Sequence, residues 1–151
     1  MLIRMSLIEN KKVRLNYEIL EQFEAGIELF GFEVKSLRGH HGSLDGAYVT
    51  IRGAEAYSVG IHIPPYQVAN TPESYDPLRI RRLLLHKKEI TKLSGVEGQK
   101  GLTIVPLSVY NKGTNIKVSI AIVKGKKKHD KRESLKKREA MRDINRTLKG
   151  E

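Results

Sequence analysis

The side chains that could carry chemistry in this chain are few, and their spacing does not suit catalysis. The five histidines, His40, His41, His62, His86 and His129, show no HExxH or comparable metal-ligand spacing, and the chain has no cysteine. The serines of KSLR and GSLDG lack the strand-turn-helix setting of a nucleophilic serine, and no phosphate-binding P-loop is present. Acid pairs such as Glu21 and Glu24 are spaced like ordinary surface charge. We therefore expect a binding protein with no metal, cofactor or enzymatic activity.

Positive charge is the main chemical property of the chain. Its 28 lysines and arginines stand against 17 acids, a formal net charge of +11 that favours polyanions: nucleic acid, an anionic membrane surface or an acidic protein. Residues 124–151 hold twelve of the basic residues and five of the acids, a net charge of +7, which leaves +4 for residues 1–123. The sequence thus predicts a mildly basic domain over residues 1–123 and a strongly basic tail over residues 124–151.

The tail consists largely of helix-forming residues. Asp130 and Glu133 have the spacing of a capping box, and Met141, Ile144 and Leu148 fall on one short apolar stripe. A stripe of this length buries too little area to offset about 1–2 kcal/mol of backbone entropy per ordered residue. We expect the tail to be disordered when free and helical on a partner. The alternative is a solvated charge run that only aids solubility.

Alternating apolar residues predict that the domain is built from antiparallel hairpins. In residues 116–122 isoleucine and valine alternate with lysine, serine and alanine, and the turn NKGTN joins this run to residues 102–110. A second hairpin joins residues 48–51 to residues 57–63 across RGAE. On its second strand, one face is expected to carry Tyr57, Val59, Ile61 and Ile63. Residues 13–31 hold further short β-leaning runs, with Phe23, Ala25, Ile27 and Leu29 on one face.

Two segments break the β pattern and are predicted to be helical. GFEVKSLRGHHG (31–42) has room for two turns, with Lys35 and Arg38 facing outward. DPLRIRRLLLHKKEITKLSG (76–95) begins with an N-cap Asp76 and ends at Gly95, and a break near Leu85–His86 would divide it into two helices. Its core stripe is expected to contain Ile80, Leu83, Leu84 and Ile90. The fold class is therefore mainly β, an oligonucleotide-binding-type antiparallel barrel of about six strands with two or three short helices.

The N-terminal residues and the hydropathy of the chain indicate where in the cell the protein is expected. MLIRMSLIENKK interrupts its apolar residues with polar ones, unlike a secretory signal, and no run is long enough to span a membrane. We expect a cytoplasmic, monomeric protein that does not enter a membrane.

Five stretches of the chain, taken in order and at their spacing, resemble the small protein B family, which binds transfer-messenger RNA (tmRNA) in bacterial trans-translation. They are FEAGIELFGFEVKSLR (23–38), HIPPY (62–66), DPLRIRRLLLHKKEI (76–90), LTIVPLSVY (102–110) and GKKKHDKRESLKKRE (125–139). The resemblance implies a barrel that binds the tRNA-like half of tmRNA, supports its alanylation by alanyl-tRNA synthetase, and promotes its delivery with elongation factor Tu·GTP to stalled 70S ribosomes. It further implies that the tail enters the empty mRNA path, folds along 16S rRNA and tests for missing message.

The resemblance also assigns residues. Those that match positions the family needs for tmRNA binding are Asn10, Glu24, Leu84 and Lys117, and Lys35 and Arg38 lie in the RNA-facing helix. In the tail, the residues that match the hinge and the DKR segment are Gly125, Lys126, Lys127, His129, Asp130, Lys131 and Arg132, while Met141, Ile144 and Leu148 would give the helix its apolar contacts. Ala140 departs from relatives that place a large aromatic there.

Each assignment has a plainer alternative. Leu84 could be a core residue, and Lys117 could be ordinary solvent-exposed charge. Glu24 would repel phosphate, so it is expected to accept hydrogen bonds from base amino groups or to brace a neighbouring arginine. For the whole chain, the alternatives are a ribosomal or initiation-factor-like barrel protein and an RNA-processing enzyme.

Overall fold

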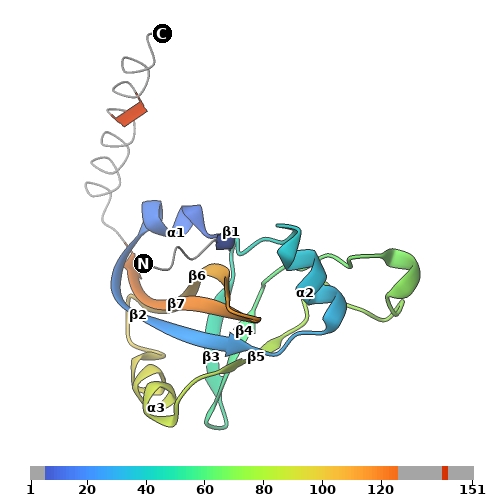
Figure 1. The fold of residues 1–151 in the computed structure, drawn as a ribbon. Helices are drawn as coiled ribbons and strands as arrows, with labels where there is room; N and C mark the ends of the chain where they lie inside the picture. Colours follow the sequence, from blue (N-terminus) through green and yellow to red (C-terminus); the bar gives the residue numbers. More distant parts are fainter. Residues whose placement is uncertain (1–5, 126–140, 143–151) are drawn as a thin grey trace.

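The computed structural model describes residues 6–125 together with Met141 and Arg142, which are helical (Figure 1). In chain order the elements are β1 (Ser6–Glu9), α1 (Lys11–Asn16), β2 (Tyr17–Ile27), α2 (Gly31–Arg38), β3 (Tyr48–Arg52), β4 (Glu55–Val59), the 3-10 turn η1 (Val68–Asn70), β5 (Arg81–Leu84), α3 (Lys87–Val96), β6 (Leu102–Lys112) and β7 (Asn115–Gly125).

The strands of the described residues form one antiparallel sheet in the order β1-β6-β7-β2-β5-β4-β3. The sheet curls, because β3 at one end of this order lies against β6 near the other end. The interior is filled by side chains from every strand and by Leu37 of α2 and Leu93 of α3, both fully buried. The predicted barrel class is confirmed, with seven strands in the described residues where about six were expected.

Both predicted hairpins are present, and their turns explain their register. Gly53 and Ala54 join β3 to β4 with φ of 56° and 64°, the two positive values that a type I′ turn requires. Gly113, with φ of 63°, opens the two-residue turn between β6 and β7. The β6–β7 pair buries the alternating residues Ile116, Val118, Ile120 and Ile122 in the barrel, as the pattern predicted.

The predicted face of the second hairpin is wrong. Within β4 the buried side chains are Ala56 and Ser58, so Tyr57 and Val59 point out of the barrel while Ile61 and Ile63 are buried. Gly60 separates the two pairs. Its φ of 86° reverses the alternation, and an added Cβ would lie 3.3 Å from the Cα of Ala47. The alternation of apolar residues thus continues in the sequence through Gly60, although the side chains before and after Gly60 lie on opposite faces of the sheet.

The single helix predicted over residues 76–95 is also wrong in its first half. Asp76 does receive a hydrogen bond from the Leu78 N–H, at 2.9 Å, but this closes only a turn. The chain then becomes β5, which inserts between β2 and β4, and α3 begins after His86, near the expected break. The helix continues through Gly95 to Val96. An apolar and basic run such as RIRRLLL suits a helix or a strand, and here pairing with distant strands selects the strand.

Residues 11–29 differ from the prediction in a second way. Residues 11–16 form α1, which was not predicted, and residues 17–27 form the single long strand β2, with a bulge between Ile19 and Glu21. Phe23, Ala25, Ile27 and Leu29 do share the face that packs on the core. Helix α1 covers the opposite face of the β6–β7 pair, where a second small core gathers Val13, Val105, Leu107, Ala121 and Val123.

A buried carboxylate joins α2 to the loop that leads into β5. Glu33 of α2 and Arg81 of β5 are both fully buried and pair at 2.6 Å between Nη2 and Oε2. Arg79 also pairs with Glu33, the Phe30 N–H donates to it at 2.8 Å, and the Tyr75 hydroxyl lies 2.8 Å from Oε2. Arg81 in turn donates to the carbonyls of Ile61 and Pro77, at 2.7 and 3.0 Å. This Glu33 cluster fixes the loop over residues 61–81, which runs beside α2 in Figure 1.

The protonation of the Glu33 cluster follows from its surroundings. Burial raises the pKa of Glu33, but the hydrogen bonds from Arg79 and Phe30 and the charge of Arg81 outweigh it and hold the pKa below its ordinary value. Burial and the bond to Glu33 raise the pKa of Tyr75 to about 12. At neutral pH the cluster therefore contains a carboxylate, two guanidinium groups and a protonated phenol.

A second carboxylate closes the gap between β3 and α3. Glu97, directly after α3, accepts hydrogen bonds from the Thr50 hydroxyl at 2.9 Å and from the Ile51 N–H at 2.6 Å. The main chain of β3 is thereby tied to the helix that lies between β3 and β6.

We predict that Glu33→Gln lowers the free energy of unfolding at pH 7 by about 3–5 kcal/mol, because Arg81 would keep a buried charge with no counter-charge. A carboxylate with a lowered pKa stabilises the fold above its unfolded-state pKa and loses this contribution as the pH falls through the folded-state pKa. The difference between wild type and variant should therefore shrink below about pH 4.5, the ordinary pKa of a glutamate. Urea unfolding of both proteins at a series of pH values measures this difference in the free energy of unfolding.

The control is Glu21→Gln. Glu21 pairs with Lys92 at 2.7 Å, but both side chains are about half exposed, so the cost should be at most about 1 kcal/mol. Equal costs for the two variants, or a Glu33→Gln effect that does not change with pH, would contradict the assignment.

Candidate nucleic-acid interface

Three of the six residues assigned to RNA binding lie together around one hollow on the outer face of the barrel. The hollow has a volume of about 300 Å³, and Glu24 of β2, Leu84 of β5 and Lys117 of β7 line it. Lys117 and Leu84 both pair with Gly26 of β2, one from each side. Residues separated by more than 90 positions in the sequence thus meet across three neighbouring strands.

Gly26 shapes this hollow. A Cβ added to Gly26 would lie 3.1 Å from the Cβ of Leu84, so glycine leaves the space that the leucine occupies. On β5 the side chains alternate, with Leu83 buried and Leu84 48% exposed. Leu84 is therefore a surface residue rather than part of the core, and it offers an apolar contact at the edge of the hollow.

Glu24 is held by two donors. The Tyr110 hydroxyl donates to Oε2, and Lys112 Nζ lies 2.7 Å from Oε1. Both donors come from β6 and reach Glu24 across β7. A carboxylate has about four lone-pair sites, so Glu24 can still accept hydrogen bonds from a ligand while the lysine compensates its charge.

Arg82 of β5 also lines the hollow, and it was missed from the sequence. Its Nε donates to Glu55 Oε2 at 2.9 Å, and its Nη1 lies 3.2 Å from Glu28 Oε1. Hydrogen bonding to Glu55 and the charges of Glu55 and Glu28 raise the pKa of Arg82 above its ordinary value, so it stays charged. The sequence shows only two adjacent arginines, Arg81 and Arg82, and does not say which of them faces outward.

The hollow therefore presents both hydrogen-bond donors and acceptors. The remaining lining includes Glu55, His86 and Glu89. Phosphate offers only hydrogen-bond acceptors, so it can be bound by the donors of the hollow alone. The acceptors of the hollow suit the amino groups of base edges and the hydroxyl groups of RNA.

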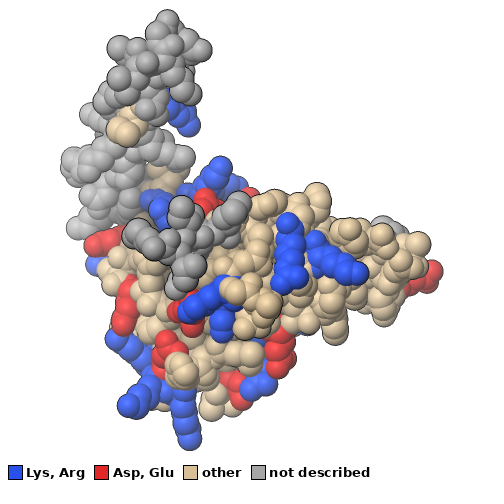
Figure 2. Space-filling view, in the orientation of Figure 1, with Lys and Arg blue, Asp and Glu red and all other residues tan. Residues whose placement is uncertain are grey.

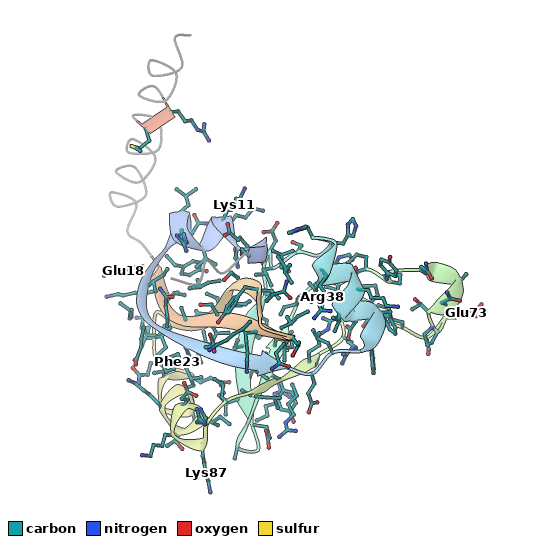
Figure 3. The ribbon with its side chains drawn as sticks, in the orientation of Figure 1. Lys11, Glu18, Phe23, Arg38, Glu73 and Lys87 are labelled. Carbon is teal, nitrogen blue, oxygen red and sulfur yellow. The ribbon has the colours of Figure 1, made fainter. Side chains whose placement is uncertain are left out.

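Lys35 and Arg38 point outward from α2, as predicted. Arg38 Nη2 donates to the carbonyl of Thr114 at 3.1 Å, so the helix is attached to the turn between β6 and β7 (Figure 3). Lys35 Nζ lies 5.9 Å from the ring centre of Tyr66, which is about half exposed. Tyr66 is the last residue of HIPPY and was not assigned a role. Figure 2 shows lysine and arginine side chains over this side of the molecule and around α3, with acidic side chains between them.

Asn10 does not lie at this surface. Its side chain is buried, and Nδ2 donates to the carbonyls of Leu44 at 3.2 Å and Pro106 at 3.1 Å. Its own N–H donates to the carbonyl of Leu107 at 2.8 Å. The structure thus gives Asn10 a positioning role, since it fixes the junction of β1 and α1 against β6.

Little of the assigned tail falls within the described residues. Gly125 is the last residue of β7 and pairs with Tyr17, and Met141 is 58% exposed. The assigned residues that lie outside the described part of the chain are Lys126, Lys127, His129, Asp130, Lys131, Arg132, Ile144 and Leu148, as does Glu133 of the expected capping box.

Within residues 6–125 and 141–142, no group of three or more His, Asp or Glu side chains is placed to hold a metal ion. No helix in that part of the chain combines the length and the apolar character needed to cross a membrane.

Known proteins resemble this chain over most of its length. The family model described as "SmpB protein" matches residues 7–150. The SsrA-binding protein of Microcystis aeruginosa is 50% identical over 141 residues, which cover 93% of this chain and 92% of that protein. The SsrA-binding protein of Gloeothece citriformis is 51% identical over 141 residues, 93% and 91% of the two chains. A chain from a solved structure described as "tmRNA-SmpB: a journey to the center of the bacterial ribosome" is 41% identical, with a TM-score of 0.67 over 84% of this chain and 92% of that chain.

We predict that Asn10→Ala lowers the free energy of unfolding by about 1–3 kcal/mol, because the buried carbonyls of Leu44 and Pro106 would lose their donor. Asn70→Ala is the control, since Asn70 bonds only to Gln67 in an exposed turn and should cost at most about 0.5 kcal/mol. Thermal or urea unfolding of the two variants measures the difference. An Asn10→Ala protein as stable as wild type would remove the positioning role.

Proposed function

The chain belongs to the SmpB protein family, and from this membership we propose that it binds tmRNA, the SsrA RNA, through the tRNA-like half of that molecule. The observation that carries the proposal is the identity of about one half, over more than nine tenths of the chain, to proteins that bind SsrA. The clustering of Glu24, Leu84 and Lys117 around one hollow supports it further, because residues that are far apart in the sequence meet in space.

The arrangement of donors and acceptors suggests how this RNA is recognised. Folded RNA is distinguished mainly by its shape and by the unpaired bases of its loops. In the proposed complex Glu24 accepts hydrogen bonds from base amino groups, Lys117 and Arg82 donate to the RNA, and Leu84 packs against it. Lys35 and Arg38 on α2 bind backbone phosphates. The chain acts as a monomeric binding protein in the cytoplasm, without a cofactor and without turning over the RNA.

The bound complex serves the rescue of stalled ribosomes. The protein supports alanylation of tmRNA by alanyl-tRNA synthetase and its delivery with elongation factor Tu·GTP to a stalled 70S ribosome. The basic tail then enters the empty mRNA path along 16S rRNA and senses that message is missing. The net charge of +7 over residues 124–151 supports this step, because a phosphate-lined channel attracts such a segment and a channel filled by mRNA excludes it.

We predict that Lys117→Gln weakens binding to the tRNA-like half of tmRNA and reduces the magnitude of the slope of log affinity against log salt by about 1, because one contact of a lysine with a phosphate is lost. Binding is measured at several salt concentrations with excess ordinary tRNA as competitor. Lys100→Gln is the matched control, because Lys100 is exposed in the loop between α3 and β6 and does not line the hollow.

The same titration separates the proposal from its alternatives. A ribosomal or initiation-factor-like protein would show no preference for the tRNA-like half over ordinary tRNA. An RNA-processing enzyme would cleave the labelled RNA on long incubation. Either result would reject the proposed function.

A truncation tests the tail. β7 runs to Gly125, so a chain that ends at Gly125 keeps every strand of the described sheet. We predict that it binds the tRNA-like half with nearly the affinity of the full chain but fails to support tagging of nascent peptides on stalled ribosomes in a purified translation system. Normal tagging by this truncated chain would contradict the proposed role of the tail.

A further inference from the structure

A second hollow of about 380 Å³ lies on the outer face of the β3–β4 hairpin. Its lining is mainly aromatic and aliphatic: Tyr48, Thr50, Arg52, Tyr57, Val59 and Ile80. Its volume is within the range of sites that bind small molecules or parts of larger ligands. None of these residues belongs to the hollow formed by Glu24, Leu84 and Lys117.

The apolar residues of this second hollow are exposed because of how the backbone is built. The reversal at Gly60 turns Tyr57 and Val59 outward while Ile61 and Ile63 remain in the core. Tyr48 is 46% exposed and Ile80 is 60% exposed. Ile80 directly precedes β5 and follows Arg79, which the Glu33 cluster holds in place. Exposed apolar residues that gather in one hollow mark a binding surface more often than a random feature of the surface.

The side chains of the second hollow suit a nucleotide. Tyr48 pairs with Val59, and Tyr57 pairs with Thr50, so the two tyrosines are diagonal neighbours on one face of the hairpin. Arg52, on the same face, is exposed, and no ion pair joins it to another residue in the described part of the chain. Aromatic faces beside a free guanidinium form the usual platform for an unpaired base and its phosphate.

The second hollow continues the candidate interface. Tyr57 pairs in register with Arg82, and Arg82 is hydrogen-bonded to Glu55 at 2.9 Å. Arg82 and Glu55 both line the first hollow, so the Arg82–Glu55 pair separates the two. An RNA bound over Glu24 and Lys117 can therefore extend across this pair and reach Tyr57.

We propose that the second hollow binds an unpaired nucleotide of the RNA that lies on the first, with its base stacked on Tyr48 and Tyr57 and its phosphate held by Arg52. The ligand class rests on the proposed function. A protein partner is the competing occupant of an apolar hollow, but the exposed Arg52 in its lining and its continuity with the RNA surface favour RNA.

The first experiment compares wild type, Tyr48→Ala, Ile80→Ala and the control Leu78→Ala in the full chain. Leu78 is 51% exposed, like the others, but does not line the hollow. Loss of one stacked base weakens binding to the tRNA-like half of tmRNA on the order of tenfold in the first two variants, with an unchanged salt slope because stacking involves no phosphate. Wild-type affinity in Tyr48→Ala, or equal losses in Tyr48→Ala and in the control Leu78→Ala, would overturn the proposal.

A second experiment needs no tmRNA, and so its failure can be told apart from failure of the proposed function. The chain has no tryptophan, so Ile80→Trp places a single indole at the hollow and Leu78→Trp places one outside it. Titration with a short oligouridine should quench the fluorescence of Ile80→Trp through stacking and leave that of Leu78→Trp nearly constant. Equal responses, or no response from Ile80→Trp, would reject the second hollow as a nucleotide site even if the chain binds tmRNA selectively.

Discussion

The ion pair between Glu33 and Arg81 is the constraint from which the position of the candidate interface follows. Both groups are fully buried, and removing either would leave a charge in the core, so α2 and the start of β5 cannot move independently. On one side of this pair α2 presents Lys35 and Arg38 to the solvent. On the other side β5 leaves the cluster and places Arg82 and Leu84 on the outer face. The pair thus fixes the relative position of two surfaces that are proposed to hold one RNA.

Much of the fold was accessible from the sequence because its strongest patterns are local. The β6–β7 hairpin, the β3–β4 hairpin and α2 each satisfy a short-range rule of periodicity or turn chemistry. β5 was not accessible, since its residues suit a helix equally well and only pairing with β2 and β4 selects the strand. The change of face at Gly60 was missed for a related reason, because the apolar alternation continues across it.

The residues of the candidate site also divide into those that could be found from the sequence and those that could not. Lys117 could be placed on the polar side of its strand by periodicity, and Glu24 and Leu84 were assigned through the resemblance. Arg82, Tyr48 and Tyr57 were missed because their importance arises from neighbours on other strands. In the first hollow Arg82 is paired with the carboxylates of Glu55 and Glu28, while residues 124–151 carry most of the net charge of the chain. In the proposed complex, recognition of RNA shape by the barrel and general attraction to phosphate by the tail are therefore separated along the chain.

The bond from Glu97 to β3 bears on how copies of this protein behave together. β3 is the last strand in the order of the sheet, and such a strand offers its free main-chain groups to a strand of another molecule. The Glu97 carboxylate already occupies the Ile51 N–H, and a neighbour that sought to pair there would have to displace a negative charge. Glu97 thus provides, in one side chain, a barrier against edge-to-edge pairing along this part of β3.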